Sequence, residues 1–170
     1  MNDNVYMKNL LGAFATAASH AIEQRIDLLG GRNISHEIAL VTVYNHPNES
    51  IDVLRKILNI SHSGAVKLVN VLEKDGLMIR CKSQLDARVT GLKVTDLGAQ
   101  RVSEILSSRD AILSDVVCNL TEEQTDQLVP IIESMMHAMT TDQPSARKIC
   151  KMCNEDVCRK RGCPVENSIY

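Results

Sequence analysis

The chain has 170 residues and a mass of 18.8 kDa, with 44% hydrophobic and 24% charged residues. This composition excludes a disordered polymer, and the length predicts one domain or one domain with an appendage. No apolar run approaches the ~18 residues that a membrane-spanning helix needs, so we expect no membrane span. The polar N-terminus predicts no secretory signal. Only 2% of the residues are aromatic, which favours an aliphatic, mainly helical core.

The formal net charge of −2 conceals an uneven distribution. Residues 50–93 carry 8 basic and 4 acidic side chains, whereas residues 94–143 carry 2 basic and 9 acidic ones. A basic segment in a nearly neutral protein is typical of nucleic-acid binding, because each phosphate contact releases a counterion. A solvated surface can show the same charge, so the interpretation requires a motif in the same segment.

The first part of the chain predicts two helices. Residues 4–30 place apolar side chains at helical spacing, and Gly30-Gly31 ends that helix. Ser35 is the expected cap of a second helix over residues 36–45.

A helix-turn-helix is predicted next. Ser50 caps a helix over 51–58, Asn59 suits the left-handed conformation that ends it, and Ser61 caps a helix that runs to Asp75. A short helix, a tight turn and a second helix form the signature of this motif.

Two strands over 77–82 and 89–95 predict a β-hairpin. A long helix capped by Asp96 follows to about residue 119. A second, with a Thr121–Gln124 capping box, runs to about residue 139. Pro130 is expected to kink or break this last helix, and residues 142–145 read as a linker.

The helix over 61–75 has two distinct faces. Four apolar residues form its buried stripe: Ala65, Leu68, Val69 and Leu72. The opposite face is polar, short-chained near its start and basic in the middle, and consists of His62, Ser63, Val66, Lys67 and Asn70. Such a face suits the major groove: lysine and asparagine bind base edges or phosphates, and valine meets a thymine methyl group.

The hairpin supports this interpretation because it is basic and directly follows the recognition helix. Its strands carry Arg80, Lys82 and Lys93, and its tip carries Arg88. An arginine at such a tip can enter the minor groove. Asp86 is expected to orient Arg88 or a nearby basic residue through a salt bridge.

These motifs resemble the multiple-antibiotic-resistance regulator (MarR) family of winged-helix transcription factors. The resemblance rests on residues 50–61, the helix ending at Leu77, the Asp86-x-Arg88 tip and Leu92-x-x-Thr95-x-x-Gly98, and it covers roughly residues 5–140. It implies a cytoplasmic homodimer that binds a pseudo-palindromic double-stranded operator. It also implies a small-molecule site in the crevice between the dimerisation and DNA-binding parts.

The resemblance and the element order divide the chain into four parts. We expect an N-terminal dimerisation helix (1–34), a winged helix-turn-helix (35–98), C-terminal dimerisation helices (99–143) and a cysteine-rich tail (144–170). The apolar stripes of residues 4–30 and 128–139 also favour a dimer, because a monomer would expose them to water.

The tail contains the pattern C-x2-C-x4-C-x4-C, formed by Cys150, Cys153, Cys158 and Cys163. A structural zinc ion is the favoured interpretation, because the segment is too short to fold without a cross-link. An iron–sulfur cluster comes next, since Cys163 precedes a proline as some cluster ligands do. Reversible disulfides come third, because nearby lysines and arginines favour thiolates.

Two lone cysteines have plainer interpretations. Cys81 is expected to pack on a wing strand, and Cys118 to be a small buried hydrophobe. The sequence shows no Ser-His-Asp order, phosphate-binding loop or pair of carboxylates that would indicate an enzyme.

The sequence thus predicts a homodimeric DNA-binding regulator, a repressor relieved by a small-molecule, metal or redox signal. The alternative is a metal- or redox-responsive protein-interaction module that uses its winged helix to bind protein partners.

Overall fold

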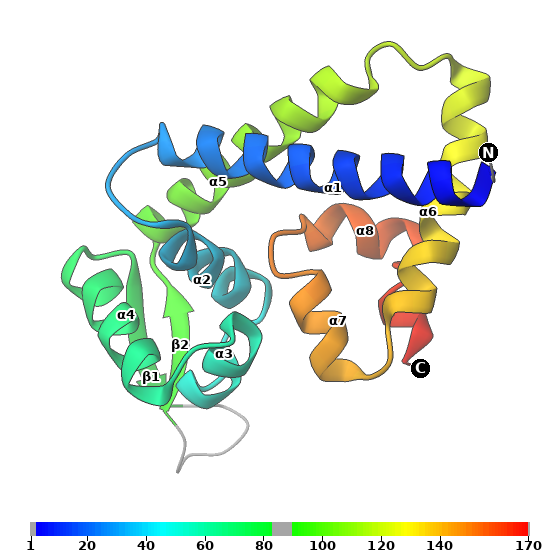
Figure 1. Cartoon of the computed structure of the whole chain (residues 1–170). Helices are drawn as coiled ribbons and strands as arrows, with labels where there is room; N and C mark the ends of the chain where they lie inside the picture. The colour runs from blue at the N-terminus through cyan, green and yellow to red at the C-terminus, as the bar shows by residue number, and fades with distance from the viewer. Residues whose placement is uncertain (1–2, 83–89, 170) are drawn as a thin grey trace.

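The computed structural model describes residues 3–82 and 90–169. Its architecture is mainly helical, with one two-stranded antiparallel sheet, as the sequence predicted (Figure 1). In chain order the elements are α1 (Asp3–Asp27), α2 (Ile34–Asn45), α3 (Ile51–Leu58), α4 (His62–Lys74), β1 (Met78–Lys82), β2 (Thr90–Val94), α5 (Asp96–Val117), α6 (Glu122–Met139), α7 (Gln143–Ile149), α8 (Glu155–Arg161) and a 3-10 turn (Glu166–Ser168).

The predicted caps of the helix-turn-helix are confirmed. The Ser50 side chain accepts from the Val53 amide, and Ser61 accepts from the Gly64 amide. Asn59 ends α3 with a φ of 54°, in the left-handed region. The reciprocal capping box of α6 is also present, as predicted. These short-range hydrogen bonds fix the turn between α3 and α4.

Two other predicted caps are wrong by one or two residues. Asn33, and not Ser35, caps α2, since its side chain accepts from the backbone amide of His36. Thr95, and not Asp96, caps α5. The Thr95 hydroxyl accepts from the Gly98 amide at 3.0 Å and donates to the Gly76 carbonyl at 2.6 Å, so it also ties α5 to the end of α4.

Two expectations about the C-terminal half need correction. Helix α6 runs unbroken through Pro130. Proline has no amide hydrogen to donate to the carbonyl of Asp126, four residues earlier, but Asp126 is exposed, so water can bind that carbonyl instead. The predicted linker 142–145 instead begins α7. Asp142 accepts from the Ser145 amide at 2.7 Å, and Pro144 occupies the first turn, where proline is well tolerated.

The main core lies where α1, α2, α3, α4, the hairpin and α5 meet. β1 and β2 pair in register from Met78 opposite Val94 to Lys82 opposite Thr90. Gly98 allows the start of α5 to approach the end of α4, because a Cβ there would lie 2.0 Å from the Leu77 carbonyl oxygen. The fully buried side chains include Leu40, Leu54, Leu72, Met78, Leu92 and Ile105.

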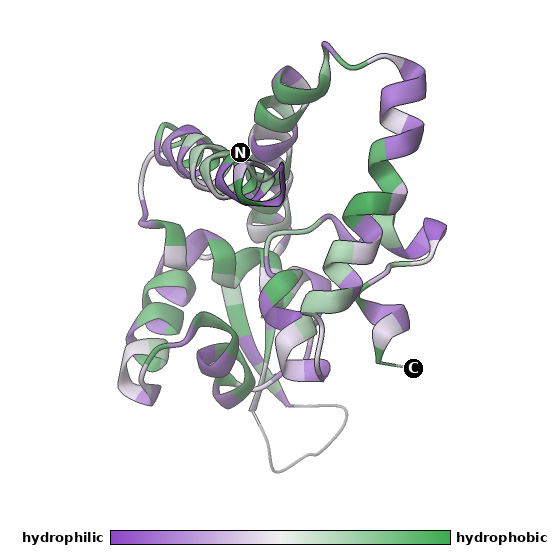
Figure 2. Cartoon of the chain, turned by 45° about the vertical axis from the view of Figure 1, so that its right-hand side comes forward, coloured by the Kyte–Doolittle hydropathy of each residue, from purple (hydrophilic) through white to green (hydrophobic). Residues whose placement is uncertain are grey.

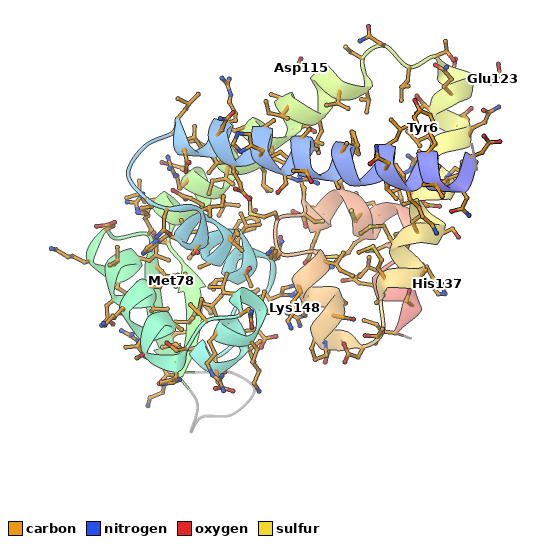
Figure 3. The ribbon with its side chains drawn as sticks, in the orientation of Figure 1. Tyr6, Met78, Asp115, Glu123, His137 and Lys148 are labelled. Carbon is orange, nitrogen blue, oxygen red and sulfur yellow. The ribbon has the colours of Figure 1, made fainter. Side chains whose placement is uncertain are left out.

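Outside this core, α1 crosses above α2 and packs on α5, while α6 descends on the far side (Figure 1). The tail folds back so that α7 contacts α3 (Figure 1). Figure 3 shows Tyr6 on α1, and Lys148 where α7 approaches α3. No helix in the described part of the chain is long and apolar enough to cross a membrane.

Helices α1 and α6 leave many apolar side chains uncovered. Figure 2 shows hydrophobic residues, in green, along both helices. Only Ile26 of α1 is buried, and no residue of α6 is. The exposed set includes Val5, Tyr6, Met7, Leu10, Phe14, Val129, Ile131, Ile132, Met135 and Met139.

Candidate nucleic-acid interface and cysteine cluster

The polar face of α4 points to solvent. His62, Ser63, Lys67 and Asn70 are exposed, and Val66 is half-buried. The opposite stripe of Ala65, Leu68, Val69 and Leu72 is buried in the core, as predicted. The helix is therefore held from behind by apolar packing, and its polar face is free to meet a macromolecule.

Arg80 binds two residues of α4. Its guanidinium forms an ion pair with Glu73, and its Nη2 donates to Asn70 Oδ1 at 2.8 Å. The Arg80 amide also donates to Glu73 Oε1 at 3.1 Å. Arg80 thus braces β1 against the recognition helix and holds the Asn70 amide so that its nitrogen remains a donor. Sequence reasoning missed Glu73, because the partners lie seven residues apart across a turn.

The rest of the wing is only partly described. Lys82, at the end of β1, is exposed, and Lys93 on β2 is half-buried. The predicted minor-groove residue Arg88 and its expected partner Asp86 lie outside the described residues. Two exposed cations, Lys67 and Lys82, are therefore available beside the polar face of α4.

A buried ion pair joins α2 to α5. Glu37 of α2 has no exposed surface, and its carboxylate accepts from Arg101 Nη2 at 2.7 Å and Nε at 3.2 Å. Arg101 also donates to the Gly30 carbonyl at 2.8 Å. The hydrogen bonds with Glu37 raise the pKa of Arg101. Sequence reasoning missed this pair, because 64 residues separate its members.

The segment between α2 and α3, residues 45–50, joins the wing to the tail. The Asn48 amide donates to the Leu92 carbonyl at 2.8 Å, and the Leu92 amide donates to the Glu49 carbonyl at 3.0 Å. Gly91 allows this approach, since a Cβ there would lie 2.8 Å from the Asn48 oxygen. A displacement of residues 45–50 would therefore be transmitted to β2.

The tail contacts residues 45–50 through three polar interactions. Asn45 Nδ2 donates to the Cys153 carbonyl at 3.0 Å. His46 Nε2 lies 2.8 Å from Glu155 Oε1, and Arg147 Nη2 lies 3.0 Å from Glu49 Oε1. The cysteine-rich tail is thus docked on the winged helix.

All four tail cysteines line one cavity of about 190 Å³. A hydrogen bond between two of the thiols raises the pKa of Cys150 and lowers that of Cys153 to about 7, while burial raises the pKa of Cys158. Among residues 3–82 and 90–169, no three His, Cys, Asp or Glu side chains are placed to bind a single metal ion.

The two lone cysteines differ from each other. The Cys81 thiol is half-buried on β1, where it donates to Asn48 Oδ1 at 3.6 Å. Cys118 is exposed at the end of α5, so the expectation that it is a buried hydrophobe is wrong. The chain turns there between α5 and α6.

A second, larger hollow lies between α5 and the tail, beside the end of α2. Its volume is about 490 Å³, and its walls include Tyr44 of α2, Ser103 and Arg109 of α5, and Asp156 of α8. Cys153 lines both this crevice and the cysteine cavity, so the two hollows are neighbours.

Known proteins resemble this chain in sequence and in fold. No family model matches the chain. The HTH-type transcriptional repressor MdtR of Bacillus subtilis is 27% identical over 109 residues, which cover 64% of this chain and 70% of that protein. The transcriptional repressor MprA of Escherichia coli is 28% identical over 122 residues, which cover 69% of each chain.

Solved structures also resemble this chain in fold. A MarR family protein from Bacillus stearothermophilus matches with a TM-score of 0.73 at 18% identity, covering 83% of this chain and 99% of that one. Streptococcus pneumoniae FabT in complex with DNA matches with a TM-score of 0.56 at 19% identity, covering 76% and 94%. The chain therefore has the winged-helix fold of MarR-family structures. The two relatives are named as transcriptional repressors, and that class of protein is non-enzymatic.

Proposed function

We propose that this chain, which has the fold of MarR-family winged-helix proteins, is a homodimeric transcriptional repressor that binds a pseudo-palindromic operator. The observation that carries the proposal is the outward polar face of α4 beside a basic hairpin. Lys67 and Lys82 would contact phosphate or guanine, and His62 and Ser63 would meet phosphate at the helix N-terminus. Asn70, whose oxygen accepts from Arg80, would act mainly as a donor.

The homodimer is supported by the uncovered apolar side chains of α1 and α6, which a soluble monomer rarely tolerates in such number. A two-fold axis would bury them and place two recognition helices about one DNA turn apart. The two relatives are named as repressors, which supports repression here.

Effector control is the remaining part of the proposal. The crevice of about 490 Å³ lies between α5 and the tail, with Tyr44 of α2 in its wall, and its size suits a small organic molecule. A ligand that binds more tightly to a conformation in which the two recognition helices do not fit the DNA would favour that conformation. It would thereby weaken DNA binding and relieve repression.

The test is a fluorescence-anisotropy titration of the protein with double-stranded genomic fragments at several salt concentrations. We expect affinity to fall steeply with salt, and Lys67→Ala to reduce the salt slope by about 1. Lys160→Ala removes the same charge from an exposed position on α8, away from α4, and serves as the matched control. Complexes that are insensitive to ionic strength, or equal losses in the two variants, would contradict the proposal and favour a protein partner.

A further inference from the structure

The tail cysteines arise from separate elements and still converge. Cys150 ends α7, Cys153 lies in the following turn, Cys158 lies within α8, and Cys163 follows Gly162, whose φ is 84°. All four line the same cavity, and a small apolar cluster that includes Cys163 surrounds it. The fold of the tail therefore gathers four sulfur ligands without any disulfide between them.

The size of the cavity distinguishes between kinds of metal centre. A single zinc ion binds sulfur at ~2.3 Å and would draw four thiolates to within roughly 4 Å of one another. The described residues place no three ligands in that way, and the cavity of about 190 Å³ is more than ten times the ~10–15 Å³ that is enough to hold one water. A cluster of several metal atoms needs more room among its ligands than a single ion does, so a cavity of this size suits it better.

The charges around the cavity can accommodate an anionic group, because the two carboxylates that line it, Glu155 and Glu166, are both paired with Arg159. Arg109 of α5 lines the neighbouring crevice, which shares Cys153 and Cys158 with the cavity. Arg147 lines the cavity, and within the described part of the chain its buried Nη1 has no hydrogen-bond partner. A buried donor of this kind normally has an acceptor. The sulfurs of a cluster accept hydrogen bonds from such groups.

We infer that Cys150, Cys153, Cys158 and Cys163 ligate an iron–sulfur cluster, and that the loaded centre holds the tail against residues 45–50. Each thiol releases its proton to solvent as its sulfur bonds to iron. The Cys153 carbonyl that Asn45 binds belongs to a ligand residue, and Glu155, which pairs with His46, lies two residues further on. The presence of the cluster does not depend on the proposed function.

The first experiment measures iron, acid-labile sulfide and zinc in the full chain purified without oxygen, together with its visible spectrum. We expect iron and sulfide in similar amounts, thiolate-to-iron absorption, and no stoichiometric zinc. Cys150→Ala and Cys163→Ala should lose most of the iron. The lone cysteines supply matched controls, since Cys81→Ala and Cys118→Ala should retain it. One zinc per chain, or metal-free protein with a disulfide among the four, would overturn the assignment.

The second experiment tests the coupling by hydrogen exchange of the loaded chain before and after removal of iron with a chelator. The Asn48 and Leu92 amides, which join residues 45–50 to β2, should exchange faster in the iron-free chain. The Val69 amide, in the buried core of α4, is the internal control and should not change. Equal exchange at Asn48 and Leu92 would overturn the coupling. Neither measurement uses DNA, so failure of the proposed function would leave both results intact.

Discussion

Replacing Arg101 with methionine would leave the carboxylate of Glu37 buried without its cation. Glu37 has no exposed surface, and the Arg101 side chain is 12% exposed. Both carboxylate oxygens accept charge-assisted hydrogen bonds from Arg101, at 2.7 and 3.2 Å. Removal of one member of such a pair costs about 3–5 kcal/mol, because the remaining charge is desolvated and unpaired. We therefore expect the free energy of unfolding to fall by that amount in Arg101→Met.

A double-mutant cycle separates this cost from a loss of packing. Glu37→Leu combined with Arg101→Met removes both charges, so stability should return to within ~2 kcal/mol of the parent chain. Glu104→Gln is the control, because Glu104 binds the same arginine at 3.2 Å but is largely exposed and should contribute under ~1 kcal/mol. Denaturant unfolding followed by circular dichroism, at one protomer concentration, measures the parent chain, the two single variants Glu37→Leu and Arg101→Met, the double variant and the control. A cost below ~1 kcal/mol for Arg101→Met, or strictly additive effects, would refute the reasoning.

Three further predictions concern stability and assembly. Gly98→Ala should destabilise the fold by about 3 kcal/mol, since the new carbon would lie 2.0 Å from the Leu77 carbonyl oxygen. Gly12→Ala is the control and should change thermal unfolding little, because a Cβ at Gly12 would have no neighbouring atom within 4 Å. Burial lowers the pKa of His36 from 6.5, so the unfolded chain binds more protons than the folded chain on acidification, and acid destabilises the fold. His36→Gln removes this effect, and in urea unfolding it should lose less stability than the parent chain between about pH 7 and pH 5. Ile132→Glu should shift the protein towards monomer in sedimentation, because it charges the exposed apolar face of α6; an unchanged mass would place the dimer contact elsewhere.

The helix-turn-helix could be predicted from the sequence because its determinants are local. Ser50 and Ser61 each cap a helix by bonding an amide three residues ahead, and Asn59 needs only its own backbone preference. The two faces of α4 follow from helical periodicity, so the outward position of Lys67 and Asn70 was predictable. Competition among neighbouring candidates caused the errors at Ser35 and Asp96, where Asn33 and Thr95 form the caps instead.

Only the tertiary structure decided which side chains meet across the chain. Glu37 and Arg101, or His46 and Glu155, are brought together by the packing of helices far apart in sequence, and no short-range pattern encodes that distance. The cysteine spacing predicted a metal site, which stays a prediction, whereas the docking of the tail on residues 45–50 depends on how α7 folds back against α3. Caps and amphipathic faces depend on residues three or four apart, so the sequence determines them, whereas long-range polar contacts exist only once the aliphatic core has fixed the relative positions of the helices.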